Sequence, residues 1–502
     1  PGSPTSPSDS PPSADPVRAD RGHGYASNVA ETLGRTGSPG TAPAAPTEFP
    51  CIDGARALAA FAVVAHHAAG FVQHGYGTDV LPTAVWAVTT VLGQIGVAAF
   101  FVLSGFLLFR PHALAARRGG PGPNAWRFWA RRSARILPAY WLALTGAIVL
   151  GAVGTGRWGL RDHLVAYGLV QNYRSGYVVL FGLGVAWTLV IEFSFYLALP
   201  LIAWGLRVVA RLTRLAPWRA QVVGLVVMGA CGLAVRTYWL TSIRGAVPNR
   251  TWFPLVQLGY WLPCYLDWFA VGMLLAVASA RVAAGGGPTR VLPAIARRTW
   301  VCWGLAAIWV WVITRSGFPT LPWRTFGAWE AWWWDLGALA VGTFLVLPAL
   351  VPGPRPDLGR RVLASPTAVL LGTVSYGVYL WNVTLFVVLE QHRGAWWSPS
   401  AGLAYLGTAV AATVAIAYLS FVLLERPVLT AVHRAVGSTR AEGAQRIRPT
   451  WRIGVGAERA RLAAWAVGTD TTGPMRWMLP AAVAGASLLL GLLLPTLRAA
   501  LG

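Results

Sequence analysis

Two ionisable side chains, Arg56 and His67, lie eleven positions apart in the apolar stretch IDGARALAAFAVVAHHAAGF, residues 52–71. An α-helix turns 100° per residue, so this spacing brings both side chains to one face, about 16 Å apart along the axis. An ionisable group inside a membrane costs about 2.5 kcal/mol or more, which makes it a candidate for function. His67 has the chemistry of a general base and Arg56 that of an anion ligand. The alternative is that Arg56 extends to lipid phosphate and His67 only bonds a neighbouring helix.

A carboxylate and a serine interrupt two further apolar stretches. Glu192 lies in AWTLVIEFSFYLALP, and we expect it to face the protein interior and to pair with His67 at a similar depth. Such a pair would fix the imidazole tautomer and leave one ring nitrogen free as a base, although a purely structural pair is the alternative. Ser104, in AAFFVLSGFLLFR, would let a ligand or a neighbouring helix approach closely, or would bond its own helix backbone.

Arg132 and Arg135, in RRSARILPAY, lie three residues apart and therefore on one helix face. Two guanidinium groups in that arrangement suit the phosphates of a bound molecule. A role in membrane topology alone is the competing interpretation.

The elements that position these residues are membrane helices. The chain is 55% hydrophobic and only 12% charged, whereas a soluble chain is about a quarter charged. Apolar stretches of about twenty residues, the length that spans a bilayer, recur along the sequence. We therefore predict an all-α polytopic transmembrane bundle of about ten core spans and one C-terminal span: 51–73, 84–109, 138–156, 186–206, 219–239, 260–280, 299–315, 334–352, 367–390, 402–425 and 478–498.

The net charge of +23 comes from arginines gathered in alternate loops, at 110–137, 207–219, 281–298 and 353–366. This is the positive-inside pattern, and it predicts a multi-pass protein of the plasma membrane with a cytoplasmic N-terminus and basic cytoplasmic loops. It excludes a nucleic-acid partner as the reason for the charge. The stretch 157–185 is expected to be external or re-entrant. The four cysteines are too widely spaced to predict a metal site or a disulfide framework.

Four regions follow from these patterns. Residues 1–50, rich in Pro, Ser and Gly, are expected to form a disordered cytoplasmic tail. Residues 51–427 form the membrane domain, 428–477 a basic cytoplasmic linker, and 478–502 an additional C-terminal transmembrane helix.

Five motifs in this order, IDGARALAAFAVVAHH, FFVLSGFLLFRP, RRSARILPAYW, WTLVIEFSFYLALP and SYGVYLWN, followed by LLERP, resemble the bacterial integral-membrane acyltransferase 3 family. The resemblance covers about residues 51–427. It implies that His67 and Glu192 are catalytic, and it places the family's Arg-x(10)-His pattern on Arg56 and His67. It also implies that the donor is held by Arg56, Ser104, Arg132 and Arg135, and that the acceptor is contacted by Trp187, Tyr379 and Asn382. Asn382 stands where relatives commonly have His, and Asn does not titrate near neutral pH.

The resemblance implies an O-acyltransferase that moves an acyl group, acetyl first among candidates, from cytoplasmic acyl-CoA to a hydroxyl of a carbohydrate, glycolipid or secondary metabolite. Acyl-CoA, most simply acetyl-CoA, would be the co-substrate, with the lipid bilayer as a partner and with no metal. Direct transfer and an acyl-His intermediate both remain open. The alternative function is a proton-coupled transporter or exporter. That class often carries repeated halves, but the Arg-x(10)-His pattern does not recur in the sequence.

Overall fold

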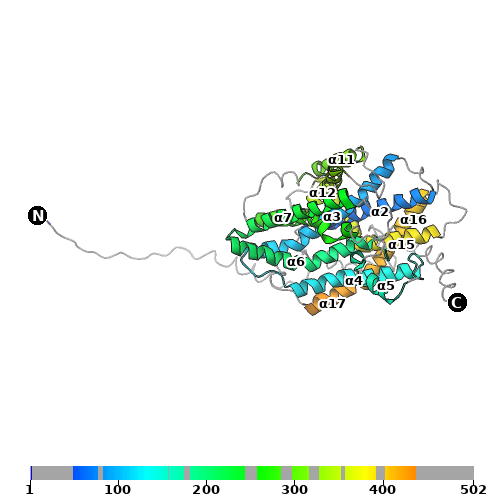
Figure 1. The fold of residues 1–502 in the computed structure, drawn as a ribbon, viewed down its shortest axis with the longest axis horizontal. Coiled ribbons are helices and arrows are strands. Elements are labelled where there is room, and N and C mark those ends of the chain that lie inside the picture. Colours follow the sequence, from blue (N-terminus) through cyan, green and yellow to red (C-terminus); the bar gives the residue numbers. More distant parts are fainter. Residues whose placement is uncertain are drawn as a thin grey trace, which may run out of the picture. The chain divides into compact units, whose positions relative to one another are not determined.

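The computed structural model describes residues 49–76, 83–156, 158–174, 181–243, 257–283, 297–315, 327–351, 357–391 and 402–436, and also Gly2. Over these ranges the regular secondary structure is helical, as Figure 1 shows, with no strand among them. The α-helices are α2 (Ile52–Tyr76), α3 (Thr83–Arg117), α4 (Ala125–Val149), α5 (Leu160–Tyr167), α6 (Ala186–Thr213), α7 (Pro217–Tyr238), α9 (Leu266–Ala283), α11 (Thr299–Arg315), α12 (Ala328–Leu350), α13 (Leu358–Leu363), α14 (Pro366–Thr373), α15 (Ser375–Gln391), α16 (Gly402–Ser420) and α17 (Arg426–Val436). Short 3-10 and π segments are η1 (Gln171–Tyr173), η2 (Trp239–Ile243), η3 (Leu258–Tyr260), η4 (Leu262–Tyr265) and η6 (Phe421–Glu425).

Within these ranges, seven helices are long and apolar enough to cross a membrane, or eight if the bent pair α14–α15 is one span. The all-α polytopic bundle is therefore confirmed, but ten core spans are not shown. Two of the expected spans do not meet the length and hydropathy expected of a membrane-spanning helix. α11 is a shorter apolar helix of 17 residues, and the N-terminal part of α4 is rich in arginine. The expected span 478–498 and the expected tail 1–50 lie outside the described residues, apart from Gly2, Phe49 and Pro50.

α4 begins earlier than the sequence suggested. Its apolar part predicts a span at 138–156, but the helix runs from Ala125 to Val149 because Asn124 caps it. The Asn124 side-chain oxygen accepts a hydrogen bond from the Arg127 backbone N–H at 3.0 Å. The basic run therefore lies on the first turns of a helix, and its arginines have fixed positions along the helix axis.

α14 and α15 replace the single span expected at 367–390, and they meet at an angle of 65°. The Ser375 hydroxyl donates to the Gly372 carbonyl oxygen at 2.7 Å, which closes the turn between them. Gly372 packs so tightly on the backbone of Asp53 that a Cβ atom there would overlap it. The bend thus allows α14 to lie against the start of α2 while α15 enters the core.

The centre of the bundle is formed by α2, α3 and α9, which approach closely at glycines. Gly105 of α3 meets the backbone of Phe269, and Gly272 of α9 meets the backbone of Val102. Small residues at helix contacts allow such close approach in membrane proteins. The Phe269 ring lies between two others, stacked at 4.6 Å on Phe101 and at 3.9 Å on Phe195. This packing fixes the register of α3, α6 and α9.

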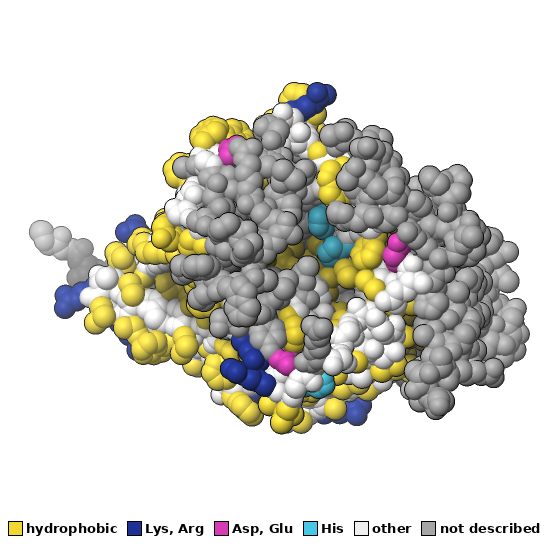
Figure 2. Space-filling model, turned by 45° about the vertical axis from the view of Figure 1, so that its right-hand side comes forward, with side chains coloured by type: hydrophobic (Ala, Val, Ile, Leu, Met, Phe, Trp, Pro, Cys, Tyr) yellow, Lys and Arg dark blue, Asp and Glu magenta, His cyan; other side chains and the backbone are white. Residues whose placement is uncertain are grey.

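The ends of several helices carry arginines and meet one another. α3 ends at Arg117, and Gly122 in the following loop lies so close to Arg207, near the end of α6, that a Cβ atom there would overlap it. The guanidinium of Arg281, at the end of α9, lies 3.7 Å from the centre of the Trp218 ring of α7. We call this the basic end of the bundle. α6 and α7 also expose apolar side chains away from the core, such as Leu201 at 65% and Trp204 at 66% exposure. Among the described side chains in Figure 2, those on the left-hand part of the view are mostly hydrophobic, as a lipid-facing surface requires.

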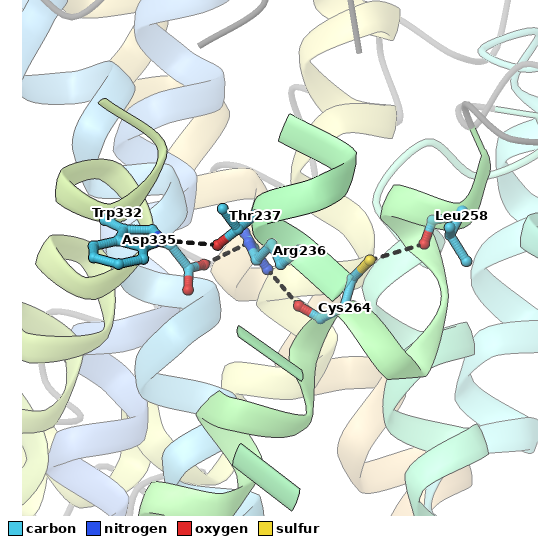
Figure 3. Close-up of polar contacts among 6 residues, drawn as sticks. All are labelled: Arg236, Thr237, Leu258, Cys264, Trp332 and Asp335. Carbon is cyan, nitrogen blue, oxygen red and sulfur yellow. Dashed lines mark hydrogen bonds and ion pairs between the residues drawn. The ribbon is translucent and has the colours of Figure 1, made fainter. Parts of the chain in front are cut away.

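A buried ion pair ties α7 to α12 (Figure 3). Arg236 of α7 pairs through Nε with the carboxylate of Asp335 on α12 and donates from a terminal nitrogen to the Cys264 carbonyl oxygen at 3.0 Å. Its guanidinium also lies over the rings of Tyr265, at 4.3 Å, and Trp268, at 4.4 Å. Both charged side chains are almost fully buried, and the sequence analysis did not identify them.

Candidate active site

A cavity of about 380 Å³ lies inside the bundle, lined by side chains of α2, α3, α4, α6, α14, α15 and α17. Its volume is in the range of small-molecule sites. Along α3 its wall extends from Val97 to Leu108, which corresponds to about 16 Å of helix. Leu108 is the nearer of the two to Arg117, where α3 ends, so the cavity extends from near the basic end toward the middle of the bundle.

The wall nearer the basic end is cationic. Four arginines line it. Two carboxylates, Asp53 and Glu192, line the same cavity. A third carboxylate, Glu425 in η6, interacts electrostatically with Arg56 and Arg135. The lining arginines are Arg56, Arg131, Arg132 and Arg135. The other end is mainly apolar, with Val97, Phe100, Phe101 and Leu189. The cavity therefore suits a molecule with an anionic part and an uncharged part.

Three of these arginines, Arg56, Arg132 and Arg135, have no carboxylate within ion-pair distance in the part of the chain that the structure describes. Arg132 is instead held by aromatic faces, with its guanidinium 5.9 Å from the ring centres of both Phe128 and Tyr196. Guanidinium groups that line a cavity without an ion pair are available to an anionic ligand. Their role in holding the donor stays a prediction.

Glu192 is held by two hydroxyl groups. Ser104 donates to its Oε1 atom at 2.6 Å and Tyr196, one turn along α6, donates to the same atom at 2.5 Å. Ser104 therefore bonds across to another helix and not to its own backbone. The expected hydrogen bond between Glu192 and His67 is not formed: across the described residues, their side-chain partners are different. The depth estimate from sequence was too coarse to separate two neighbouring polar groups.

His67 is positioned by Asn382. The Asn382 amide nitrogen donates to the carbonyl oxygens of Val378, at 3.2 Å, and Tyr379, at 2.6 Å. Since carbonyls only accept, the amide oxygen must face His67, whose Nδ1 lies 2.7 Å from it. His67 therefore carries its proton on Nδ1, and the Nε2 lone pair is available to accept a proton. The hydrogen bond to His67 that was expected from Glu192 is thus made by Asn382, which does not titrate.

Tyr379 links the cavity to the His67–Asn382 pair. Its ring lines the cavity, and its hydroxyl donates to the Val185 carbonyl oxygen at 2.9 Å and lies 2.5 Å from the Thr188 hydroxyl. Its own carbonyl oxygen accepts from Asn382, one turn further along α15. His67 and Asn382 do not themselves line the cavity, and they are joined to this residue through its backbone carbonyl. His67 is only half-buried, and Figure 2 shows histidine side chains in a recess among hydrophobic ones.

Trp187 lies apart from the cavity. Its ring contacts Tyr260 at 5.3 Å and Tyr265 at 6.1 Å, both between centroids, and Asn172 donates to the carbonyl oxygens of Trp187 and Tyr260 at 2.8 Å. The structure therefore places this residue, expected to contact the acceptor, in an aromatic cluster at the start of α6. Its acceptor role stays a prediction.

Several residues of the site were not predicted from the sequence. Tyr196 lies four residues after Glu192, a helical spacing that would have identified it. Arg131 belongs to the same basic run as Arg132. His433 and Leu429 line the cavity from α17, in the segment that was expected to be a linker beginning at 428. No sequence signal pointed to them, because their approach to the cavity depends on α17 packing beside α4.

Comparisons with known proteins agree with this architecture. The family whose description is "Acyltransferase domain" matches residues 49–424. The chain therefore belongs to the acyltransferase 3 family of membrane proteins. No solved structure matches the chain.

Three curated relatives show the range of the family. Nodulation protein 10 of Rhizobium leguminosarum bv. viciae is 27% identical over 74% of this chain and 91% of its own length. The peptidoglycan O-acetyltransferase OatA of Listeria monocytogenes is 26% identical over 76% of this chain and 55% of its own length. Acyltransferase MdmB of Streptomyces mycarofaciens is 35% identical over 30% of this chain and 38% of its own length. The chain thus spans only part of two of these three proteins.

Proposed function

We propose that this chain is an O-acyltransferase that takes an acyl group, most simply acetyl, from acyl-CoA bound in the cavity. The acceptor is a hydroxyl of a carbohydrate, glycolipid or secondary metabolite. The observation that carries the proposal is that three arginines of one cavity have no ion pair among the described residues, while Tyr379 of the same cavity is bonded to Asn382, which orients His67. The arginines suit the phosphates of CoA, and the apolar end suits its thioester arm.

The chemistry follows from the orientation of His67. Its Nε2 atom accepts the proton of the acceptor hydroxyl as that oxygen attacks the thioester carbonyl carbon. The tetrahedral intermediate then collapses, the carbon–sulfur bond breaks, and the CoA thiolate takes the proton from the imidazolium. Asn382 keeps the proton of Nδ1 in place throughout. Ser104 and Tyr196 hold Glu192 near Arg56, where it offsets part of the positive charge at the cavity wall.

We further propose that the protein lies in the plasma membrane with its basic end on the cytoplasmic side, in accord with the positive-inside rule. Acyl-CoA would then enter from the cytoplasm, and the acceptor would approach His67 from the other side. The members of the family described above support an acceptor of this kind, because one is a peptidoglycan O-acetyltransferase by name.

The test uses inside-out and right-side-out vesicles that carry the full chain, incubated with acetyl-CoA labelled in the acetyl group. We expect a labelled acceptor in inside-out vesicles only, and none when His67 is replaced by alanine. Label that enters both vesicle types equally would contradict the orientation. A wild-type protein that moves a solute with a proton but transfers no label would support the exporter instead.

A further inference from the structure

The end of the cavity away from the basic end is closed by direct helix contact. Beyond Val97, α3 turns two glycines toward α2. A Cβ atom at Gly96 would lie 2.6 Å from the Ala59 carbonyl oxygen, and one at Gly93 would lie 2.6 Å from the His66 ring. Because backbone and ring occupy this space, the two helices leave no passage between them. A route from the cavity toward His67 remains beside α15, whose Asn382 side chain bonds His67.

Two aromatic rings occupy that route. Phe100 of α3 and Tyr379 of α15 both line the cavity and meet edge to face, with 6.1 Å between ring centres. Beyond Tyr379 lies Asn382 with His67 bonded to it. A thioester in the cavity therefore meets the Phe100–Tyr379 pair before it can reach the Nε2 atom of His67.

Of these two rings, Phe100 is the one that can move. Tyr379 is fixed at its hydroxyl by Val185 and at its backbone by Asn382. Phe100 has no polar atom on its side chain and is half-buried, in contrast to its neighbour Phe101, which is 1% exposed and stacked on Phe269. A rotation of the Phe100 side chain breaks no hydrogen bond.

We propose that Phe100 is the residue that determines which acyl chain reaches His67. This inference rests on the proposed function. The ring closes the donor cavity, turns aside when the thioester advances, and leaves a space that accommodates a short acyl group. Since Gly96 meets the backbone of α2 and Gly93 meets the His66 ring, they leave no further room, and the vacated volume of Phe100 sets the limit.

The test uses the full chain in native membranes and CoA thioesters with acyl chains of two, four and six carbons. Release of CoA thiol and labelling of the acceptor are measured together. For wild type we expect the two-carbon donor to be preferred. In Phe100→Ala, the ratio of kcat/KM for the four-carbon to the two-carbon donor should rise about tenfold or more, since each methylene in an apolar pocket is discriminated by about that factor. Thiol release without acceptor labelling should also rise, as water reaches the carbonyl and forms the free acid.

Leu107→Ala is the matched control, because Leu107 lies on the same helix, lines the same cavity and is nearer the basic end. It should alter the donor KM but not the chain-length ratio. Phe100→Trp should slow acetyl transfer while inhibition by free CoA is unchanged, and it tests the proposal even if the alanine variant does not fold. An unchanged ratio in Phe100→Ala, or the same change in Leu107→Ala, overturns the assignment. A wild-type chain that transfers no acyl group overturns the proposed function itself.

Discussion

At the scale of single residues, the orientation of His67 is the feature on which the proposed chemistry depends. Asn382 holds the imidazole through one hydrogen bond, and that bond sets the tautomer. His67→Ala should lower the rate of acyl transfer by about 10²- to 10⁴-fold, the usual contribution of a general base. His66→Ala should keep most activity, because the His66 ring packs against Gly93 and takes no part in the hydrogen bond to Asn382. Steady-state kinetics on both variants check this, and equal losses in the two would contradict it.

Asn382 offers a subtler change at the same site. Asn382→Leu removes the partner of Nδ1 and leaves His67 in place, so we expect kcat to fall by about 2- to 12-fold, the equivalent of one hydrogen bond of about 0.5–1.5 kcal/mol. The donor KM should be unchanged, because Asn382 does not line the cavity. A change in donor KM with normal kcat would show that Asn382 acts on the donor site.

Glu192 provides a contrast, because it does not contact His67. Glu192→Gln keeps an oxygen that can accept from both Ser104 and Tyr196, so the pH–rate profile should keep its position. Glu192→Ala leaves both hydroxyl groups without an acceptor, and it should lower the free energy of unfolding by about 1–3 kcal/mol. Thermal unfolding in detergent and kinetics across pH measure these two effects. A shifted profile in the glutamine variant would instead couple Glu192 to His67.

At the scale of elements, Asp357 joins two helix starts. It caps α13 by accepting from the Arg360 backbone N–H at 3.0 Å, and it accepts from both the backbone and the hydroxyl of Thr299 at the start of α11. Partial burial raises the pKa of Asp357, but these hydrogen bonds together with the charge of Arg360 lower it more, so the net pKa is below the ordinary value. A carboxyl group whose pKa is lowered by folding stabilises the protein above its unfolded pKa, and this contribution is lost as the pH falls.

Asp357→Asn should therefore reduce the fall in stability on acidification below about pH 4, where an ordinary aspartate titrates. At neutral pH the variant should be less stable, by up to about 2 kcal/mol for a weakened cap. Unfolding midpoints at several pH values measure both effects. The result would contradict the assignment if wild type and variant lost stability in parallel on acidification.

The Arg236–Asp335 pair acts between α7 and α12, and Trp332 reinforces the contact by donating from its indole N–H to the Thr237 hydroxyl at 3.0 Å. Asp335→Asn would leave a buried guanidinium without its carboxylate, which costs about 3–5 kcal/mol. Trp332→Phe removes only a more exposed hydrogen bond and is the milder control. Thermal unfolding distinguishes them, and similar losses in the two variants would contradict a dominant role for the ion pair.

At the scale of the whole molecule, sequence patterns predicted the membrane bundle and six of the residues that line the cavity, because polar and ionisable groups are easily recognised in apolar stretches. Arg56, Ser104, Arg132, Arg135, Glu192 and Tyr379 do line one cavity. What the patterns could not give was the pairing of side chains. His67 and Asn382 come from different helices, α2 and α15, and helical spacing within one segment does not reveal contacts with another. Asp335, like Glu192, is an ionisable residue in an apolar stretch. It was not predicted because it follows a run of tryptophans, which is typical of a membrane interface.

The arginines that give the molecule its net charge can set its orientation in the membrane or bind the donor. Arg132 lines the cavity, whereas Arg127, on the first turn of the same helix, does not. Both residues contribute equally to a positive-inside signal. If Arg132 binds a phosphate group of CoA, Arg132→Gln should raise the donor KM by about 10- to 150-fold, the equivalent of 1.5–3 kcal/mol for a charged hydrogen bond, and Arg127→Gln should not. Wild-type donor affinity should fall as salt rises, and less steeply in Arg132→Gln, because one charge fewer is screened. Equal KM values in the two variants, with mixed orientation of the protein in the membrane, would show that the basic run of α4 serves topology alone.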